Sequence, residues 1–200
     1  MPVATEPLGR RERNKQAKLA RITAAASELF AEHGVDEVTT QQIADAADIG
    51  TGTLFLYAKT KGELLLLVQN THYAAALERG RADAAEKSTA LDAVVALLAH
   101  VVACNRVQID NGRTYLREMV FGDPTEPHHA EALAIVGQTE DAAAELLTQH
   151  LGLANEDAAT LARVMSAIMF LTLSSSEFLH STVDQIIDAI RIQIAAILPH

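Results

Sequence analysis

The sequence predicts an all-α protein of about nine helices, with a small N-terminal helix-turn-helix domain and a larger C-terminal helical bundle. Aromatic residues make up 4% of the 200 residues and tryptophan is absent, which disfavours sheets built on aromatic and β-branched alternation. Apolar residues instead recur at helical spacing, and cap patterns precede several of these segments. We divide the chain into a disordered arm (1–9), the helix-turn-helix domain (10–60) and the bundle (61–200).

The N-terminal domain contains three predicted helices. The first is expected from about Arg11 to His33 on the basis of its apolar face. Thr39 and Gln42 form a capping-box pattern that opens the second helix. The break at residues 48–50 is typical of a helix-turn-helix corner, and the third helix is expected from Thr51 to about Lys59.

Six further helices are expected in the bundle. We assign their ends where Gly, Pro or Asn-Gly interrupts the apolar pattern. One break is therefore predicted at Asp110–Gly112, and the last helix is expected to open with a Ser181 and Asp184 cap pattern. The predicted ranges are 61–81, 89–110, 114–122, 126–151, 155–179 and 182–198.

Charge is distributed unevenly along the chain. The net charge is −10, and residues 61–200 carry nine Lys or Arg against eighteen Asp or Glu. Residues 10–21 carry six basic residues against Glu12 alone. An acidic body with one basic segment predicts contact with phosphates at one end only, although a solvated charge run on an ordinary helix is the alternative.

Three spaced segments resemble the signature of TetR-family transcriptional regulators. They are Thr39-Thr40-x-x-Ile43-Ala44-x-x-Ala47, Gly52-Thr53-Leu54-Phe55-x-Tyr57 and Lys61-x-x-Leu64-Leu65, and they cover about a quarter of the chain. The alternative is that these helices only pack a core. The resemblance implies a dimeric, sequence-specific DNA-binding regulator, most simply a repressor released from a pseudo-palindromic operator by an apolar small-molecule effector.

The resemblance also implies roles for particular residues of the corner. Side chains facing the major groove would be Thr40, Gln41, Thr51, Thr53 and Leu56, with Gly52 letting the backbone approach the bases, and Phe55, Tyr57 and Lys61 would lie along the phosphates. Four positions depart from the usual pattern. Phe55 stands where tyrosine is commoner, and Gly50 replaces a frequent serine at the helix cap. Ala58 stands where a large aromatic residue is common, and Asp48 replaces a frequent glycine in the turn, where a left-handed conformation is still accessible.

The bundle is expected to hold the dimer interface and the effector. By the resemblance, the helices at about 155–179 and 182–198 would form the homodimer contact, although their apolar stripes could equally pack within one subunit. Soft or polar residues on otherwise apolar segments are the candidates to line an effector cavity. They are His100, Cys104, Tyr115, Met119, Met165, Met169, Phe170 and Phe178. The acidic body favours a neutral or cationic apolar effector.

The helix that begins at Lys61 is the predicted route from this cavity to DNA. Its first turn would contact phosphate, and its body would wall the cavity through Leu64, Leu67, Val68 and Thr71. Neither a metal nor a cofactor is predicted. His100 and Cys104 lie one turn apart but two ligands make no site, and the adjacent His128 and His129 are expected at the surface.

Other classes of protein are disfavoured. The sequence has no Gly-rich phosphate loop, HExxH motif or nucleophile elbow, which argues against an all-α enzyme. A ligand-independent architectural DNA-binding protein is the nearer alternative, but it would not need so large an acidic body. No signal peptide or membrane-spanning apolar run is expected, and the single cysteine, Cys104, fits a reducing cytoplasm.

Overall fold

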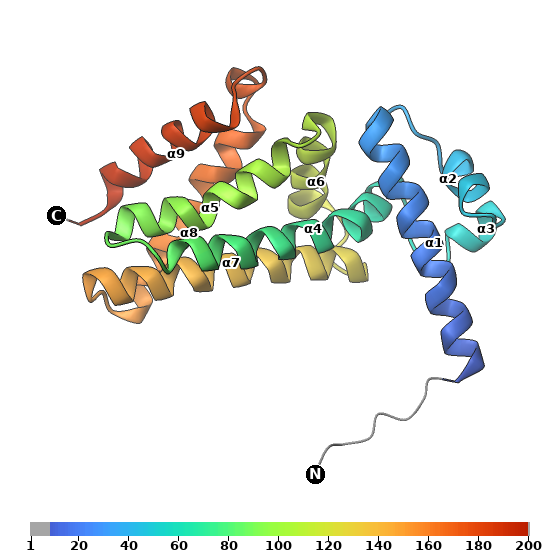
Figure 1. The fold of residues 1–200 in the computed structure, drawn as a ribbon, viewed down its shortest axis with the longest axis horizontal. Coiled ribbons are helices and arrows are strands. Elements are labelled where there is room, and N and C mark those ends of the chain that lie inside the picture. The colour runs from blue at the N-terminus through green and yellow to red at the C-terminus, as the bar shows by residue number, and fades with distance from the viewer. Residues whose placement is uncertain (1–8, 200) are drawn as a thin grey trace, which may run out of the picture.

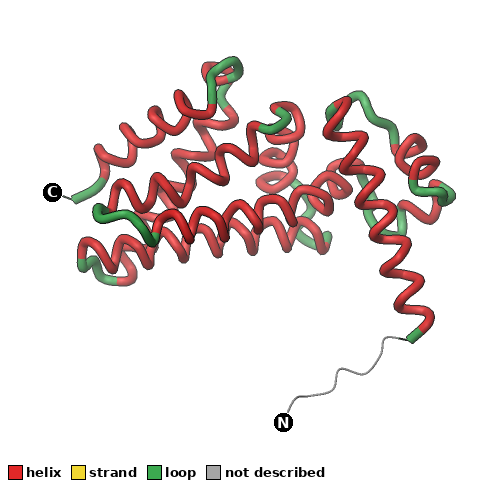
Figure 2. The backbone as a smooth tube through the Cα atoms, viewed as in Figure 1, coloured by secondary structure: helices red, strands yellow, loops and turns green. Residues whose placement is uncertain are grey.

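The computed structural model describes residues 9–199. Apart from Gly9, the predicted disordered arm lies outside the described residues. Within 9–199 the chain forms nine α-helices and one 3₁₀ helix and contains no strand (Figures 1 and 2), which confirms the all-α class. The elements are α1 (Arg10–His33), α2 (Thr40–Ala46), α3 (Thr51–Leu54), α4 (Lys61–Ala84), α5 (Ala90–Arg106), α6 (Ile109–Phe121), α7 (Pro127–Leu151), α8 (Asn155–Ser174), η1 (Ser176–Phe178) and α9 (Val183–Ile197).

The helices form two groups at opposite ends of an elongated molecule (Figure 1). At one end α1, α2 and α3 lie together, and the N-terminal half of α1 projects beyond the body of the molecule. Helix α4 begins against α1 and continues into the larger group, where it packs on α5 and α7. Helices α8 and α9 pack on each other and on α7 and α5 respectively, away from the corner formed by α2 and α3.

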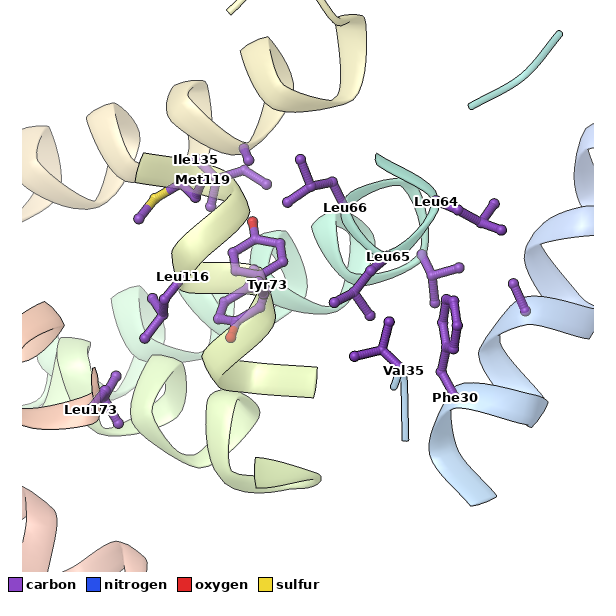
Figure 3. Close-up of a cluster of buried hydrophobic side chains, with 14 of the residues drawn as sticks. Phe30, Val35, Leu64, Leu65, Leu66, Tyr73, Leu116, Met119, Ile135 and Leu173 are labelled. Carbon is purple, nitrogen blue, oxygen red and sulfur yellow. The ribbon is translucent and has the colours of Figure 1, made fainter. Parts of the chain in front are cut away.

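One continuous hydrophobic core joins the two groups. Phe30 near the end of α1 and Val35 just after it lie beside Leu64 and Leu65 of α4 (Figure 3). Gly34 ends α1 with a φ of 78°, a conformation that glycine adopts at little cost. Helix α4 begins at Lys61, and the core runs across this point, so the domain boundary at residue 60 stays a prediction.

The predicted helix break at Asp110–Gly112 is wrong, because these residues lie inside α6. Gln108 instead opens α6, its side chain accepting the backbone N–H of Asn111 at 2.7 Å. Gly112 lies so close to α5 that a Cβ there would be 2.1 Å from the carbonyl oxygen of Asn105. The Asn-Gly pair therefore marks a close approach of two helices, not a turn.

The third helix is shorter than predicted. It ends at Leu54 and not near Lys59, because the backbone tightens into turns in which the N–H groups of Leu56 and Tyr57 reach back three residues. The N–H of Tyr57 donates to the carbonyl of Leu54 at 2.9 Å, and the N–H of Ala58 donates to the same oxygen at 3.3 Å. The turns still carry the side chains of residues 55–58 in a fixed order around the corner.

The two C-terminal helices also begin or end elsewhere than predicted. Helix α8 stops at Ser174, and Ser175 then caps a separate 3₁₀ turn before Leu179. The capping box of α9 consists of Thr182 and Gln185, one residue later than the predicted cap pattern. A cap position shifted by one residue is the usual error when several Ser and Thr residues stand together.

Helix α8 is long and apolar enough, by length and composition, to cross a membrane, with a mean hydropathy of 1.3. The expectation that no segment reaches this threshold was therefore too strong. Core helices of soluble proteins meet the same criterion, and α8 packs on both α7 and α9. Only 33% of its apolar window is buried within one chain, and Val164 and Leu171 are 42% and 68% exposed.

Candidate DNA interface and ligand cavities

The corner formed by α2 and α3 is determined by local hydrogen bonds. The Thr39 hydroxyl accepts the N–H of Gln42 at 3.2 Å, and the Gln42 side chain accepts the N–H of Thr39 at 2.7 Å, which confirms the predicted capping box. Asp48 turns the chain with a φ of 53°, in the left-handed region. Leu54 and Ala58 are buried, so the other side chains of α3 and its following turns face outward.

A row of hydrogen-bonded polar side chains links the start of α3 to α2. The Thr51 hydroxyl donates to Oε1 of Gln41 at 2.7 Å, and Nε2 of Gln41 donates to Oδ1 of Asp45 at 2.8 Å. Gln41 and Asp45 are exposed, and Thr51 is half-buried. Sequence reasoning missed Asp45, although its spacing of four residues from Gln41 on one helix face was the available signal.

The remaining residues expected at the groove lie on the same corner. Leu56 is 83% exposed and Phe55 is 44% exposed, so residues 9–199 leave much of these two large apolar side chains accessible to solvent. Gly52 is exposed, and Thr40 and Thr53 are half-buried. The corner therefore presents these residues outward together, and their contacts with bases remain predictions.

Two of the expected phosphate contacts are engaged with backbone carbonyls. The Tyr57 hydroxyl donates to the carbonyl oxygen of Lys15 at 3.4 Å, which ties the corner to the basic start of α1. The Lys61 ammonium donates to the carbonyl oxygen of Asp36 at 3.1 Å. Both groups lie near the surface and are held by bonds that solvent or an anion can replace.

The basic start of α1 is exposed along its whole length. Arg21 forms an ion pair with Asp48 at 3.4 Å. The other five basic residues of this segment make no ion pair with any residue in 9–199; they are Arg10, Arg11, Arg13, Lys15 and Lys18. This end of the molecule therefore carries positive charge that the acidic chain does not neutralise locally.

The larger domain contains an apolar cavity of about 260 Å³, open to the surface, among α4, α5, α6, α7 and α8. Four of the eight predicted ligand residues line it, namely Tyr115, Met119, Met169 and Phe170. Tyr73, Leu116 and Ile135 line it too and were missed, because they look like ordinary core residues in the sequence (Figure 3). A Glu140–Arg163 ion pair of 3.8 Å lies among the lining residues.

Two stacked tyrosines form one wall of this apolar cavity. The rings of Tyr73 and Tyr115 are 4.1 Å apart between centroids and inclined by 19°. The Tyr115 hydroxyl donates to Oδ1 of Asn70 at 2.9 Å, and Nδ2 of Asn105 donates to the Tyr73 hydroxyl at 2.8 Å. Burial raises the pKa of both phenols, so they are neutral at physiological pH.

The other four predicted ligand residues lie outside the apolar cavity, in three different parts of the structure. His100 and Cys104 line a second cavity, of about 540 Å³, between α1 and helices α4 to α6. Met165 is packed in the core with 1% exposure. Phe178 is half-buried on η1, and its carbonyl oxygen accepts a hydrogen bond from Arg106 at 2.9 Å. The sequence cannot distinguish these positions, because all lie on apolar helical faces.

The cavity walls do not support the predicted route from the effector cavity to DNA through the body of α4. The side chains of Leu64, Leu67, Val68 and Thr71 line neither of these two cavities, and Tyr73 is the residue of α4 that both cavities share. Contacts across the junction of the two domains involve the N-terminus of α7 instead. These contacts involve His128, the neighbour of His129.

The expectation that His128 and His129 lie at the surface is wrong. His129 is 3% exposed, and neither of its ring nitrogens has a hydrogen-bond partner among residues 9–199. The N–H of His128 donates to Oε1 of Glu63 at 2.8 Å, and its Nε2 lies 3.2 Å from the carbonyl oxygen of Tyr57. Burial raises the pKa of Glu63. The pair packs there because α7 begins directly against the first turn of α4.

Metal binding finds no support in the described residues. No group of three or more His, Cys, Asp or Glu side chains within 9–199 is arranged to hold a metal ion. Burial also raises the pKa of the Cys104 thiol to about 11, which keeps it protonated and poorly nucleophilic at neutral pH.

Comparison with known proteins finds a family match in the N-terminal part of the chain. Residues 22–68 match the family model described as bacterial regulatory proteins, tetR family, and this range includes the whole α2–α3 corner and the start of α4. This N-terminal part of the chain is therefore similar to the TetR family. The sequence-based resemblance to this family is therefore confirmed, and its relatives are named as regulators, in agreement with the prediction that the chain is not an enzyme.

Individual relatives extend the likeness. A fatty acid metabolism regulator protein of Bacillus subtilis is 33% identical over 78 residues, which are 39% of this chain and 40% of that protein. The match thus spans less than half of the relative's length. The structure of Thermus thermophilus FadR, a TetR-family repressor in complex with lauroyl-CoA, has a TM-score of 0.67 at 23% identity, covering 91% of this chain and 96% of that one.

A TetR transcriptional regulator from Rhodococcus sp. RHA1 resembles the chain over a similar extent. Its TM-score is 0.68 at 18% identity, with 92% of this chain and 97% of that one covered. At these identities the two structural likenesses establish a common fold.

Proposed function

We propose that this TetR-like protein is a dimeric, sequence-specific DNA-binding regulator, most simply a repressor that leaves its operator when an apolar effector binds. The observation that carries the proposal is the exposed Thr51–Gln41–Asp45 row beside the uncompensated basic start of α1. Polar side chains prearranged by hydrogen bonds can read base edges, and the cations can contact the flanking phosphates.

The dimer is supported by apolar surface at the end of the molecule opposite the corner. The centre of the predicted α9 stripe, Ile186, Ile190 and Ile194, is buried within the chain and so is unavailable to a partner. Leu171 of α8 and Ile192 of α9 remain 68% and 71% exposed. Two such helices from each subunit can bury this surface in an isologous four-helix contact.

Sedimentation equilibrium tests the dimer. Leu171→Asp places a charge in the proposed contact and should yield monomers, whereas Leu56→Asp, at a leucine that is also largely exposed but lies on the corner, should leave the association constant unchanged. Dimers of undiminished affinity in Leu171→Asp would place the subunit contact elsewhere.

Selection from a random DNA pool tests sequence-specific binding. The chain should recover a pseudo-palindrome with half-sites about one helical turn or a multiple apart. Its affinity should fall by roughly 1,000-fold or more between 50 and 200 mM salt if six to ten phosphates are neutralised. An architectural protein would recover no preferred sequence, and an enzyme would retain no DNA.

Two variants separate base reading from phosphate contact. Gln41→Ala should change the preferred base at particular positions by about 1–3 kcal/mol, because it removes the centre of the hydrogen-bonded row. Lys61→Ala should weaken all sequences alike and make the salt dependence shallower. An unchanged selected site with Gln41→Ala would show that the residue does not read bases.

The apolar cavity is the proposed effector site, and an acyl chain is the ligand that suits it best. Its lining includes Leu116, Met119, Val120 and Ile135, and the relatives include a fatty acid metabolism regulator and a FadR bound to lauroyl-CoA. Its volume of about 260 Å³ is near the lower end of ligand pockets, which suits one chain more than a broad ring system.

Calorimetric titration with lauroyl-CoA tests the effector site. Val120→Trp should fill the cavity and weaken binding at least about tenfold, the factor that corresponds to 1.4 kcal/mol. Leu133→Trp is the matched control, because Val120 and Leu133 are both 45% exposed but Leu133 does not line the cavity.

Linkage further requires that selected operator DNA weaken lauroyl-CoA binding by the factor by which lauroyl-CoA weakens DNA binding. Equal affinities for lauroyl-CoA with and without operator DNA would contradict the proposal that the effector releases the protein from its operator.

A further inference from the structure

The second cavity lies between the two domains. It has a volume of about 540 Å³, within the range of roughly 300–1,000 Å³ typical of ligand sites. One wall comes from α1, through Ser27 and Ala31, and the others come from α4, α5 and α6. A molecule held there would contact the DNA-binding domain and the larger domain at once.

The charge of this cavity is opposite to that of the chain. Its lining includes Arg79, His72 and His100 and contains no Asp or Glu. Arg79 is exposed and forms no ion pair with any side chain of the described part of the chain. His100 is the basic lining residue with an acidic partner among residues 9–199, since its Nε2 lies 2.6 Å from Oδ2 of Asp83.

The other titratable groups of the cavity do not offset this charge. Burial raises the pKa of the Cys104 thiol to about 11, and burial likewise raises the pKa of the Tyr73 phenol. Both groups are therefore neutral at physiological pH. An arginine without a carboxylate partner, beside two histidines and neutral donors such as Gln69, is a suitable partner for a carboxylate or phosphate.

We propose that the interdomain cavity binds an anionic group, a carboxylate or a phosphate, with Arg79 as its principal partner. This inference does not depend on the acyl-chain effector. Tyr73 lines both cavities, so the anion can be the head of an amphiphile whose tail occupies the apolar cavity, or it can be a separate small anion. The acidic composition of residues 61–200 predicts the opposite preference, but a ligand responds mainly to charges within about 8 Å, the screening length at physiological salt.

Titration of the full chain with four probes tests the proposal. Inorganic phosphate and coenzyme A supply the anion without a tail, laurate supplies both, and dodecanol supplies the tail alone. Arg79→Gln should weaken binding of the anionic probes by roughly 10- to 100-fold, the usual cost of one charged hydrogen-bonding partner, and leave dodecanol unaffected. Arg117→Gln is the control, because it is an exposed arginine on α6 that does not line this cavity.

NMR resonances of the histidine rings provide a second measurement, which reports where a probe binds. Phosphate or coenzyme A should shift the signals of His72 and His100, which line the cavity, and not that of His150 at the end of α7. If phosphate and coenzyme A show this behaviour, the site accepts a separate anion. If only laurate does, the anion is the head of an amphiphile. The proposal is overturned if no anionic probe binds, or if Arg79→Gln binds them all as tightly as the unmodified chain.

Discussion

The α2–α3 corner and the junction between the two domains are held by different kinds of contact. In the corner, the bonded side chains Gln41 and Asp45 are 4 residues apart, and Thr51 and Gln41 are 10 apart. Across the junction, Asn111 bonds to Phe30 over 81 residues and His128 to Tyr57 over 71. The corner is therefore a product of local sequence, whereas the junction exists only when distant segments have already packed.

The two regions also use polar groups differently. Those of the corner are exposed, and water can replace each partner, so each bond contributes little to stability and much to the arrangement of the surface. At the junction the Asn111 side chain is buried, so loss of one partner leaves the other without solvent. The same number of hydrogen bonds should thus have unequal effects on the free energy of unfolding.

The largest effect is expected where the core crosses the junction. Phe30→Ala should lower the free energy of unfolding by about 3–5 kcal/mol, because Phe30 is fully buried between α1 and α4 (Figure 3). Phe55→Ala, which truncates a half-exposed ring on the corner, should change it by less than about 1 kcal/mol. Urea denaturation measures both, and similar losses would mean that the core does not continue from α1 into α4.

A smaller loss is expected from the polar contact at the same place. Asn111 is 2% exposed, donates to the Phe30 carbonyl at 2.8 Å and accepts the N–H of Val35 at 2.7 Å. Asn111→Ala should cost about 1–3 kcal/mol, because the Val35 N–H loses its partner while buried. Hydrogen exchange should accelerate at that amide in particular.

Asn155→Ala, an exposed asparagine at the start of α8, is the control for this substitution and should stay within about 0.5 kcal/mol. Unchanged exchange at Val35 in Asn111→Ala would indicate that another group satisfies the amide, and the contrast between junction and corner would weaken.

The smallest effect is expected from the local contact that opens α2. Thr39→Ala removes one half of the capping box and should cost about 1 kcal/mol, because the N–H of Gln42 remains accessible to water. Faster hydrogen exchange should be confined to the first turn of α2. Thr160→Ala, which removes an exposed hydroxyl bonded within α8, should have less effect still. A loss as large as that of Asn111→Ala would show that the corner depends on more than its local caps.

Sequence-based prediction succeeded where a feature depends on neighbouring residues and failed where it depends on packing between distant segments. The capping box at Thr39 and the turn at Asp48 were predictable, because both depend on residues a few positions apart. The Asn111-Gly112 pair looked like a turn, because side chains that favour turns are also the ones that fit buried seams between helices. His129 looked like a surface residue for a similar reason, since nothing near it in the sequence buries it.

The sequence by itself determined the all-α class, the resemblance to the TetR family and the positions of the corner residues, because periodicity, caps and motif spacing are short-range properties. Tertiary structure alone decided that the eight candidate ligand residues separate into an apolar cavity, a cationic cavity and ordinary core. Each of them lies on an apolar helical face, and only the packing of five or six helices determines which faces leave a space between them. The charge of a cavity likewise belongs to the few side chains that surround it, and the composition of the whole chain does not report it.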